Sequence, residues 1–322
     1  MPMPRLRLSV HSSANKPQLT LNKNEAAPFR AASFFVYLPV IHLLIVKLGL
    51  VLEGGGMRGL YTAGVLDVFM DKGIKADVIC GTSAGVTFGI NLPSEQKGRV
   101  LRYNLDYAHD KRYISLRSLL LSGDVVNRKF AYEMLPDVLD PFDYDTYRKS
   151  GVTFFATVTN VNTGLAEYIR LTDCRKQMDV IRASASLPFM SRKVYLDGVP
   201  YLDGGISDNI PLDKCLEEGC DKVIVILTHA RGYVKTESLY TLGKILYPKD
   251  KNLHEAFRVR NDNYNKRLRQ IEELEAQGRI SVLRPSRELD VSRLERDPSK
   301  LKALYDLGVA DALEAPELYT LK

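Results

Sequence analysis

The apolar residues of this chain fall into short runs that end at glycine-rich turns. The runs 48–52 and 77–80 each stop at such a turn, and a segment with helical spacing follows each one, at 60–69 and 84–90. Buried strands of a parallel sheet read as continuous apolar runs, and a crossover, usually a helix, must separate them. The pattern therefore predicts two strand–turn–helix units whose turns face each other across neighbouring parallel strands.

Later segments extend the same plan. Further strands are predicted at 152–158, 166–171, 222–227 and 280–283. The turn Asn162-Thr163-Gly164 makes the first two of these an antiparallel hairpin. Helices are predicted at 253–276, which carries an apolar stripe and ends at Gly278, and at 302–313. The fold class that follows is α/β: a three-layer α/β/α sandwich on a mostly parallel sheet, with a mainly helical C-terminal extension.

Three glycine-containing turns carry the candidate chemistry. They are Gly54-Gly55-Gly56-Met57-Arg58-Gly59, Gly81-Thr82-Ser83-Ala84-Gly85 and Asp203-Gly204-Gly205. A G-x-S-x-G turn places its serine on a sharp strand-to-helix corner and exposes the hydroxyl. Acyl transfer needs such a nucleophile, N–H donors for the developing oxyanion, and a base. The turns offer a candidate for each role, since consecutive glycines let backbone N–H groups approach a substrate carbonyl.

The first turn also fits another chemistry. Gly54–Gly59 matches the dinucleotide-binding fingerprint G-x-G-x-x-G, in which Asp71 or Asp77 would bind a ribose. A nucleotide- or cofactor-binding protein is therefore an alternative. That interpretation gives no role to the serine turn or to Asp-Gly-Gly. A phosphate-binding P-loop is excluded because no Gly-Lys-Ser/Thr follows.

The three turns, in this order, resemble those of the patatin-like phospholipase family. Ala183-Ser184-Ala185-Ser186-Leu187-Pro188 is also similar to a stretch that this family carries ahead of its aspartate. The resemblance covers roughly residues 48–216, and the remainder is similar to the C-terminal extension of a bacterial subgroup. It implies a serine hydrolase that cleaves acyl esters of lipids, of the phospholipase A or lysophospholipase type, without cofactor or metal. The implied site residues are Ser83 as nucleophile, Asp203 as general base, Gly54, Gly55, Gly56, Met57, Arg58 and Gly59 as oxyanion hole, and Gly81, Gly85, Gly204 and Gly205 as turn glycines.

Two aspartates and one histidine bear on the choice of base. Asp197-Gly198 lies between two short apolar runs, as a hairpin turn would, so we expect a structural role for Asp197. Asp203 ends the returning run and matches the family motif, and it is the better candidate. A conventional Ser-Asp-His carboxylesterase needs a histidine downstream of the acid, and His229 is well placed for it. The resemblance favours a Ser-Asp dyad, with the triad as the alternative.

The ends of the chain suggest its organisation. The leader 1–47 is polar at first, which predicts disorder, and then carries the apolar run 33–46. A signal-peptide core, a membrane anchor and sequence upstream of a misassigned start all remain open for it. A catalytic domain is expected at 48–216. The C-terminal extension, 217–322, begins with the strand 222–227, which we expect to join the same sheet.

Charge and cysteine content narrow the class of protein. The net charge is +6, of which +5 falls in residues 1–47, where six basic residues meet one acid. The rest of the chain is nearly neutral, which argues against nucleic-acid binding. The four cysteines show no C-x-x-C and no metal-ligand spacing. These features predict a reduced, cytoplasmic protein, with membrane association left open.

One stretch suggests how a lipid substrate would be reached. Residues 107–121 mix Lys111, Arg112 and Arg117 with apolar side chains. An interfacial helix that makes peripheral contact with phospholipid headgroups has this composition. A helix that packs on the core with a solvated basic face has it too, and both interpretations stay open. The expected partner is a lipid or phospholipid ester, and the oligomeric state is not predicted.

Overall fold

A mixed sheet organises residues 46–318, the part of the chain that the computed structural model describes. The predicted leader falls on residues 1–45, outside this part, except for Val46 and Lys47. The strands are β1 (Leu48–Leu52), β2 (Val78–Thr82), β3 (Thr153–Asn160), β4 (Ala166–Leu171), β5 (Val194–Leu196), β6 (Val199–Asp203), β7 (Lys222–Ile226) and β8 (Ser281–Leu283). Their order is β5-β6-β3-β2-β1-β7-β8, with β4 paired to β3. The five strands from β3 to β8 are parallel, which confirms the predicted mostly parallel sheet.

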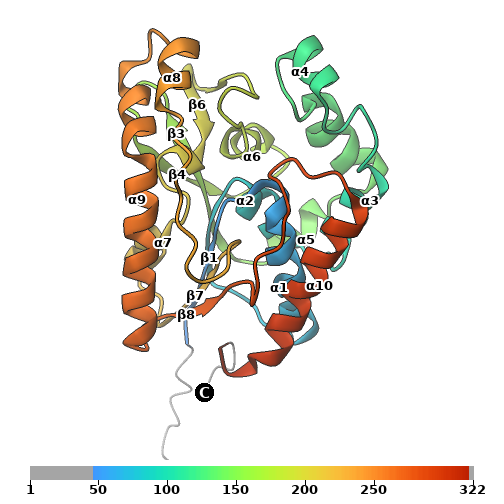
Figure 1. Cartoon of the computed structure of the whole chain (residues 1–322). Helices are drawn as coiled ribbons and strands as arrows, with labels where there is room; N and C mark the ends of the chain where they lie inside the picture. The colour runs from blue at the N-terminus through green and yellow to red at the C-terminus, as the bar shows by residue number, and fades with distance from the viewer. Residues whose placement is uncertain (1–45, 319–322) are drawn as a thin grey trace, which may run out of the picture. The chain divides into compact units, whose positions relative to one another are not determined.

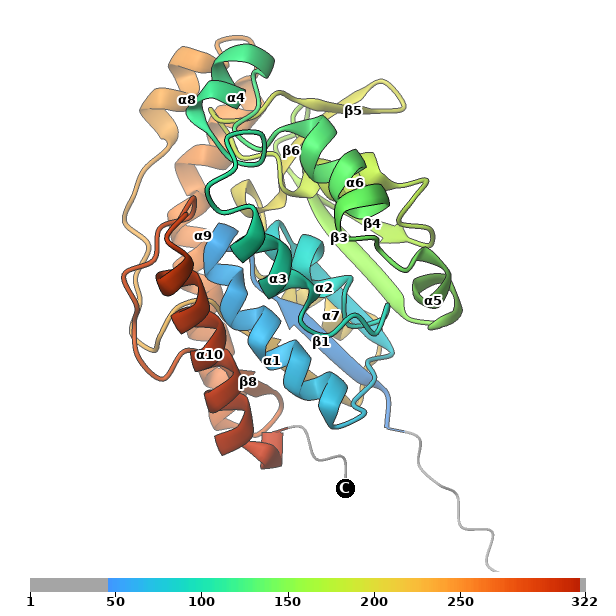
Figure 2. The same ribbon diagram turned by 90° about the vertical axis from the view of Figure 1, so that its right-hand side faces the viewer.

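Helices cover both faces of this sheet. They are α1 (Leu60–Asp71), α2 (Ala84–Gly89), α3 (Arg99–Asp106), α4 (Leu116–Ser122), α5 (Tyr144–Lys149), α6 (Met178–Ser184), α7 (Leu212–Glu217), α8 (Tyr240–Leu246), α9 (Lys251–Ala276) and α10 (Pro298–Glu314), with a π-helix at Phe130–Leu139. Figures 1 and 2 show α1, α2, α3 and α10 on one face, and α7 and α9 on the other. The three-layer sandwich and the mainly helical C-terminal region are therefore confirmed. None of the helices in residues 46–318 is long and apolar enough to cross a membrane.

The central strand β1 shows why its residues form an unbroken apolar run. Leu48, Leu50 and Leu52 point into the core beneath α1 and α10. Val51 points the other way and packs in the cluster that includes Tyr264 of α9. Because side chains alternate across a strand, a strand with helices on both faces needs apolar residues at every position.

The long strand β3 brings two distant turns together. β2 pairs with its first part, ending with Thr82 opposite Thr157, and β6 pairs with its last part, where Asp203 lies opposite Val158. β4 occupies the other edge of β3 along residues 154–159. β2 and β6 must therefore share one edge and meet end to end. This pairing places the turn after β2 beside the end of β6.

The stretch 107–121 is helical only in its last part, so the expected helix is wrong for its first part. α3 ends at Asp106, and the Asp110 carboxylate then accepts the N–H of Arg112 at 2.7 Å, which forms a turn. The helix α4 begins after Ser115, whose hydroxyl accepts the N–H of Ser118 at 3.0 Å.

The other predicted elements lie close to those observed. The antiparallel pairing of β3 with β4 confirms the predicted hairpin. Asp197 and Gly198 form the turn between β5 and β6, both with positive φ, 48° and 82°. α10 starts four residues earlier than predicted because Asp297 caps it and Pro298 occupies its first turn.

Candidate active site

Ser83 occupies a strained turn between β2 and α2. Its φ of 54° and ψ of −117° lie in a region that residues with a side chain rarely adopt. The hydroxyl of Ser184, at the end of α6, accepts the N–H of Ser83 at 2.9 Å and donates to the carbonyl of Thr157 at 2.7 Å. All three residues are buried. The strained turn is therefore tied to β3 through one serine hydroxyl.

Asp203 lies directly against the Ser83 hydroxyl. Ser83 Oγ donates to Asp203 Oδ2 at 2.7 Å, and the N–H of Gly205 donates to Oδ1 at 2.7 Å. Burial raises the pKa of Asp203, while the hydrogen bonds from Ser83 and Gly205 partly oppose the shift. The result is a hydroxyl oxygen aligned with a carboxylate whose proton affinity is increased.

The glycine turn between β1 and α1 supplies backbone donors. Three of its N–H groups donate to backbone carbonyl groups at 3.0–3.3 Å: those of Gly54, Met57 and Arg58. Within residues 46–318, no acceptor takes the N–H groups of Gly55 and Gly56. Both glycines line the same cavity as Ser83. Gly56 has a φ of +58°, and a Cβ there would lie 2.4 Å from the Arg293 carbonyl oxygen, so a side chain is excluded.

Glu53, the residue before this turn, is a buried carboxylate with every oxygen in use. Oε1 accepts from the hydroxyl of Tyr264 at 2.6 Å and from Asn209 Nδ2 at 3.1 Å. Oε2 accepts the N–H of Thr228 at 2.6 Å. Asn209 Nδ2 also donates to the carbonyl of Gly54 at 2.8 Å. Glu53 therefore anchors the glycine turn to α9 and to the end of β7, as a positioning residue.

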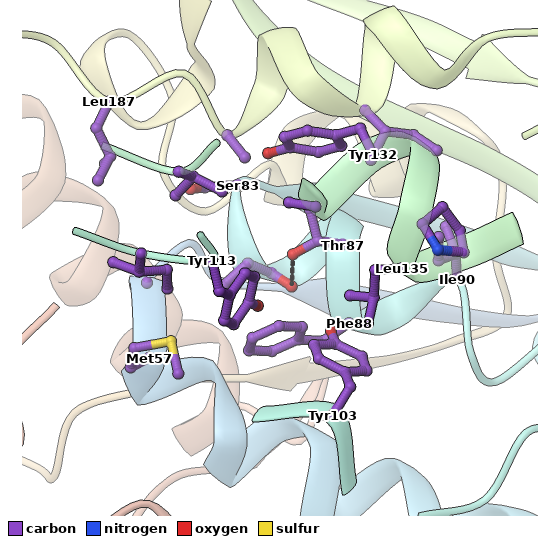
Figure 3. Close-up of a pocket in the computed structure, with 18 of the residues that line it drawn as sticks. Met57, Ser83, Thr87, Phe88, Ile90, Tyr103, Tyr113, Tyr132, Leu135 and Leu187 are labelled. Atoms are coloured by element: carbon purple, nitrogen blue, oxygen red, sulfur yellow. Dashed lines mark hydrogen bonds between the residues drawn. The ribbon is translucent and has the colours of Figure 1, made fainter. Parts of the chain in front are cut away.

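A largely apolar pocket of about 120 Å³ opens from Ser83. Figure 3 shows Ser83 and Leu187 at one side of this pocket and Ile90 and Leu135 at the other. Among the other lining residues are Met57, Phe88, Tyr103, Tyr113, Val126, Tyr132, Met178 and Ile181. Such a lining suits an alkyl chain, because burial of each methylene group stabilises by about 0.8 kcal/mol.

A second, smaller cavity of about 40 Å³ is also lined by Ser83, and many of its other lining residues are charged. Its lining includes Asp203 and the cationic side chains of Arg58, Lys235, Arg260 and Arg293. Gly56, Ser83, Leu187 and Arg293 line both cavities. Ser83 thus borders both an apolar and a polar compartment.

His229 lines the polar cavity but is bonded elsewhere. Its Nδ1 lies 2.8 Å from Glu288 Oε1, and its ring stacks on Tyr233 with the ring centroids 3.5 Å apart. Burial lowers its pKa. No hydrogen bond in the described part of the chain joins it to Ser83 or Asp203.

Comparison with known proteins identifies the family of this chain. A family model described as patatin-like phospholipase matches residues 50–216, just over half of the chain. The chain belongs to the patatin-like phospholipase family. A second family model, described as a domain of unknown function, matches residues 250–318 of this patatin-like chain.

The relatives share the patatin-like part. The chain is 32% identical to "Uncharacterized protein YjjU" of Escherichia coli K12 over 187 aligned residues. These residues make up 56% of this chain and 52% of that protein. It is 29% identical over 180 residues to "Lysophospholipase NTE1" of Scheffersomyces stipitis, covering 55% of this chain and 11% of the relative. The Saccharomyces cerevisiae protein of the same name is 28% identical over 181 residues, which cover 56% of this chain and 10% of that protein. The chain thus spans about half the length of the bacterial relative and about a tenth of the yeast proteins.

One solved structure with a slight likeness is VipD from Legionella pneumophila. It has a TM-score of 0.42 and 11% identity, and covers 85% of this chain and 67% of that chain. A likeness of this size carries no argument about function.

Several residues around Ser83 lie outside the three sequence motifs. An acid at the end of an otherwise apolar run was a usable signal for Glu53. Ser184 lay in a segment noted only for its resemblance. Arg260 and Arg293 had no signal, because isolated arginines in a charged C-terminal region look like surface residues. Within residues 46–318, no cluster of three or more histidine, cysteine, aspartate or glutamate side chains is arranged to hold a metal ion.

Proposed function

We propose that this protein is a serine hydrolase that cleaves acyl esters of lipids, of the phospholipase A or lysophospholipase type. The observation that carries the proposal is the hydrogen bond of 2.7 Å from Ser83 Oγ to Asp203 Oδ2, at the entrance to an apolar pocket. Membership of the patatin-like phospholipase family supports it. The yeast relatives are named lysophospholipases, and this name points to the same class of ester.

The reaction begins with proton transfer from Ser83 to Asp203. Ser83 Oγ attacks the carbonyl carbon of the ester as its proton passes to Asp203 Oδ2. The negative charge that forms on the carbonyl oxygen is stabilised by the N–H groups of Gly55 and Gly56, the two donors of the turn without an acceptor. Collapse of this intermediate expels the alcohol, which takes the proton back from Asp203.

The second half of the reaction releases the acyl chain. Asp203, again a carboxylate, removes a proton from a water molecule that attacks the acyl ester on Ser83. The bond between the acyl carbon and Ser83 Oγ then breaks, the fatty acid leaves, and Asp203 returns the proton to Ser83 Oγ. The raised pKa of Asp203 favours both proton transfers, since a base of low proton affinity would hold the proton too weakly. The apolar pocket holds the acyl chain throughout.

Two alternatives have less support. A Ser-Asp-His triad needs an imidazole bonded between the acid and the serine, whereas His229 pairs with Glu288 and Asp203 bonds Ser83 directly. A nucleotide site at Gly54–Gly59 gives no role to the Ser83–Asp203 pair.

We also propose peripheral contact with a lipid surface through α4. Leu116, Leu120 and Leu121 of this helix are 72%, 85% and 74% exposed. Figures 1 and 2 place α4 and α8 at the same end of the sheet, and Ile245 of α8 is also exposed. Exposed apolar side chains gathered at one end mark a contact surface. With Arg117 beside them, they suit an anionic lipid surface.

The hydrolase proposal is tested with the full chain, a lysophospholipid and a fluorophosphonate probe. Ser83→Ala should abolish hydrolysis and labelling, and Asp203→Asn should lower kcat by several orders of magnitude. Asp197→Asn is the matched control, the same substitution at an exposed hairpin turn, and should have little effect.

Gly55→Ala should lower kcat about 100-fold or more, because a Cβ there would lie 2.8 Å from Thr228 Oγ1 and displace the donors.

Two results would contradict the proposal. Labelling that persists in Ser83→Ala would mean that another serine is the nucleophile. His229→Ala should cost little, and a loss as large as that of Asp203→Asn would mean that the site is a triad.

A further inference from the structure

We propose that the polar cavity beside Ser83 is an anion subsite, in which Lys235, Arg260 and Arg293 bind the phosphate of a glycerophosphate acyl ester. This inference rests on the proposed ester hydrolysis and names its substrate class. The phosphate and the acyl chain would then occupy the two compartments that Ser83 borders.

The charges that line the cavity are strongly unbalanced. Four cationic side chains line it: Arg58, Lys235, Arg260 and Arg293. Its two carboxylates are already engaged. Asp203 accepts from Ser83 and Gly205, and Glu53 accepts three hydrogen bonds from the surrounding protein. Arg293 also pairs with Glu237 at 3.8 Å, whereas none of the ion pairs within residues 46–318 involves Arg58, Lys235 or Arg260. Four cations against two lining carboxylates leave an excess of positive charge, so an anionic ligand would complete the cavity.

Arg260 is buried with part of its hydrogen-bonding capacity unused. Its side chain comes from α9, and the residue is only 8% exposed. Nε donates to the carbonyl of Gly205 at 2.9 Å, but Nη1 is buried and has no partner within the described residues. An unpartnered buried donor destabilises the folded protein, and a charged one does so more strongly. A bound phosphate oxygen would remove this cost, and Arg260 lines the cavity that would hold it.

Lys235 is likewise buried, at 5% exposed, in the loop between β7 and α8. Its ammonium group lies 3.6 Å from the centroid of the Tyr264 ring, and no carboxylate of the described residues forms an ion pair with it. Burial lowers the pKa of Lys235 well below its usual range, and Arg260 and Arg293 lower it further, while the Glu53 carboxylate opposes part of the shift. An anion in the cavity would favour the charged form of all three side chains.

The geometry relates this cavity to the reaction. Ser83, Gly56 and Arg293 line both the polar and the apolar cavity. In a glycerophospholipid, only the glycerol unit separates the phosphate from the acyl ester. An ester carbonyl at Ser83 would therefore direct its acyl chain to the apolar cavity and its phosphate to the polar one. The polar cavity, about 40 Å³, has a third of the volume of the apolar pocket of about 120 Å³, so it suits a compact charged group better than an alkyl chain.

The subsite gives the C-terminal region a role in the patatin-like site. Arg260 and Arg293 both lie within residues 250–318, the part matched by the domain of unknown function. The carbonyl of Arg293 also accepts the N–H of Met57 at 3.0 Å, so the same residue contacts the glycine turn. The C-terminal region would thus supply the headgroup side of a site whose nucleophile and base come from the matched catalytic part.

The first experiment compares two esters with the same acyl chain, a 1-acylglycerol 3-phosphate and the uncharged 1-acylglycerol. The measured quantity is the ratio of their kcat/KM values in the full chain. Lys235→Met and Arg293→Gln should each lower this ratio about ten- to a hundredfold, the effect of losing one hydrogen bond to a charged group. Arg287→Gln, an exposed arginine of the same segment, is the matched control and should leave the ratio unchanged. A ratio unchanged in both cavity variants would overturn the inference.

The second experiment needs no catalysis. The Tm of Ser83→Ala protein should rise with glycerol 3-phosphate or inorganic phosphate at constant ionic strength, and this rise should be lost when Lys235→Met or Arg293→Gln is added. No rise in Tm would overturn the subsite. A rise without any change in the ratio would mean a site for free phosphate and would refute the lipid assignment. Phosphate stabilisation in a protein that cleaves no ester would refute the hydrolase proposal but leave the anion subsite standing.

Discussion

Replacement of Ser184 by alanine tests whether one buried hydroxyl holds the nucleophile turn in place. In Ser184→Ala the N–H of Ser83 loses its acceptor at 2.9 Å, and the carbonyl of Thr157 loses a donor at 2.7 Å. Ser184 is fully buried, so bulk water does not reach these groups. Ser83 also adopts a backbone conformation that costs about 1–3 kcal/mol and persists only where its surroundings enforce it.

The expected magnitude follows from these contacts. A buried donor left without a partner costs about 1–3 kcal/mol, which corresponds to a decrease in Tm of roughly 2–5 °C for a domain of this size. The larger effect should be on catalysis, because Ser83 Oγ is aligned with Asp203 Oδ2 only while the turn keeps its shape. A displacement of about 1 Å lowers a rate by roughly 100-fold, so kcat should fall by about that factor.

Ser186→Ala is the matched control, since it removes the same atom two residues further along. The Ser186 hydroxyl donates to the carbonyl of Arg182 at 2.7 Å, and its backbone carbonyl, which accepts the N–H of Asp203 at 2.9 Å, is unchanged by the substitution. Its loss should lower Tm by a few degrees at most and leave kcat unchanged. Both variants are assayed with the same ester, with Tm followed by circular dichroism. Equal kcat values for the two variants would refute the bracing role of Ser184.

Two further predictions concern the pH dependence of hydrolysis and the binding of lipid vesicles. Burial holds the pKa of Asp203 above its ordinary value of 3.8, and the base must be ionised to take the proton from Ser83. Therefore kcat/KM for an uncharged ester should decline as the pH falls through this raised pKa, and an acid limb centred at or below 3.8 would contradict the environment described for Asp203. For the lipid contact, the double variant Leu120→Asp and Leu121→Asp should sediment severalfold less with vesicles of anionic phospholipid, while Leu313→Asp, an exposed leucine of α10, should bind as the unmodified chain does. Vesicle binding that is unaffected by the α4 substitutions would rule out this surface.

The local plan of the fold was open to prediction because its signals are local. The apolar runs at β1 and β2, the glycine turns after them and the helices that follow occupy neighbouring positions in the chain. Burial on both faces makes such strands apolar throughout, so their pattern is visible without a partner. The sandwich and the mostly parallel sheet follow from repeating this unit. The stretch 107–121 shows the limit, since the turn at Asp110 interrupts it and the cap at Ser115 lets a helix begin only at Leu116.

The candidate active site also has a part that the sequence predicts and a part that depends on tertiary structure. By itself the sequence determined which turns carry a serine, an aspartate and consecutive glycines, because each motif is a few adjacent residues. Only the tertiary structure decided that Ser83 and Asp203, 120 residues apart, form a hydrogen bond, since β2 and β6 meet end to end on one edge of β3. It alone also gathered Lys235, Arg260 and Arg293 around one cavity. A buried cation looks like a surface residue in sequence, because the contacts that bury it come from segments far away along the chain.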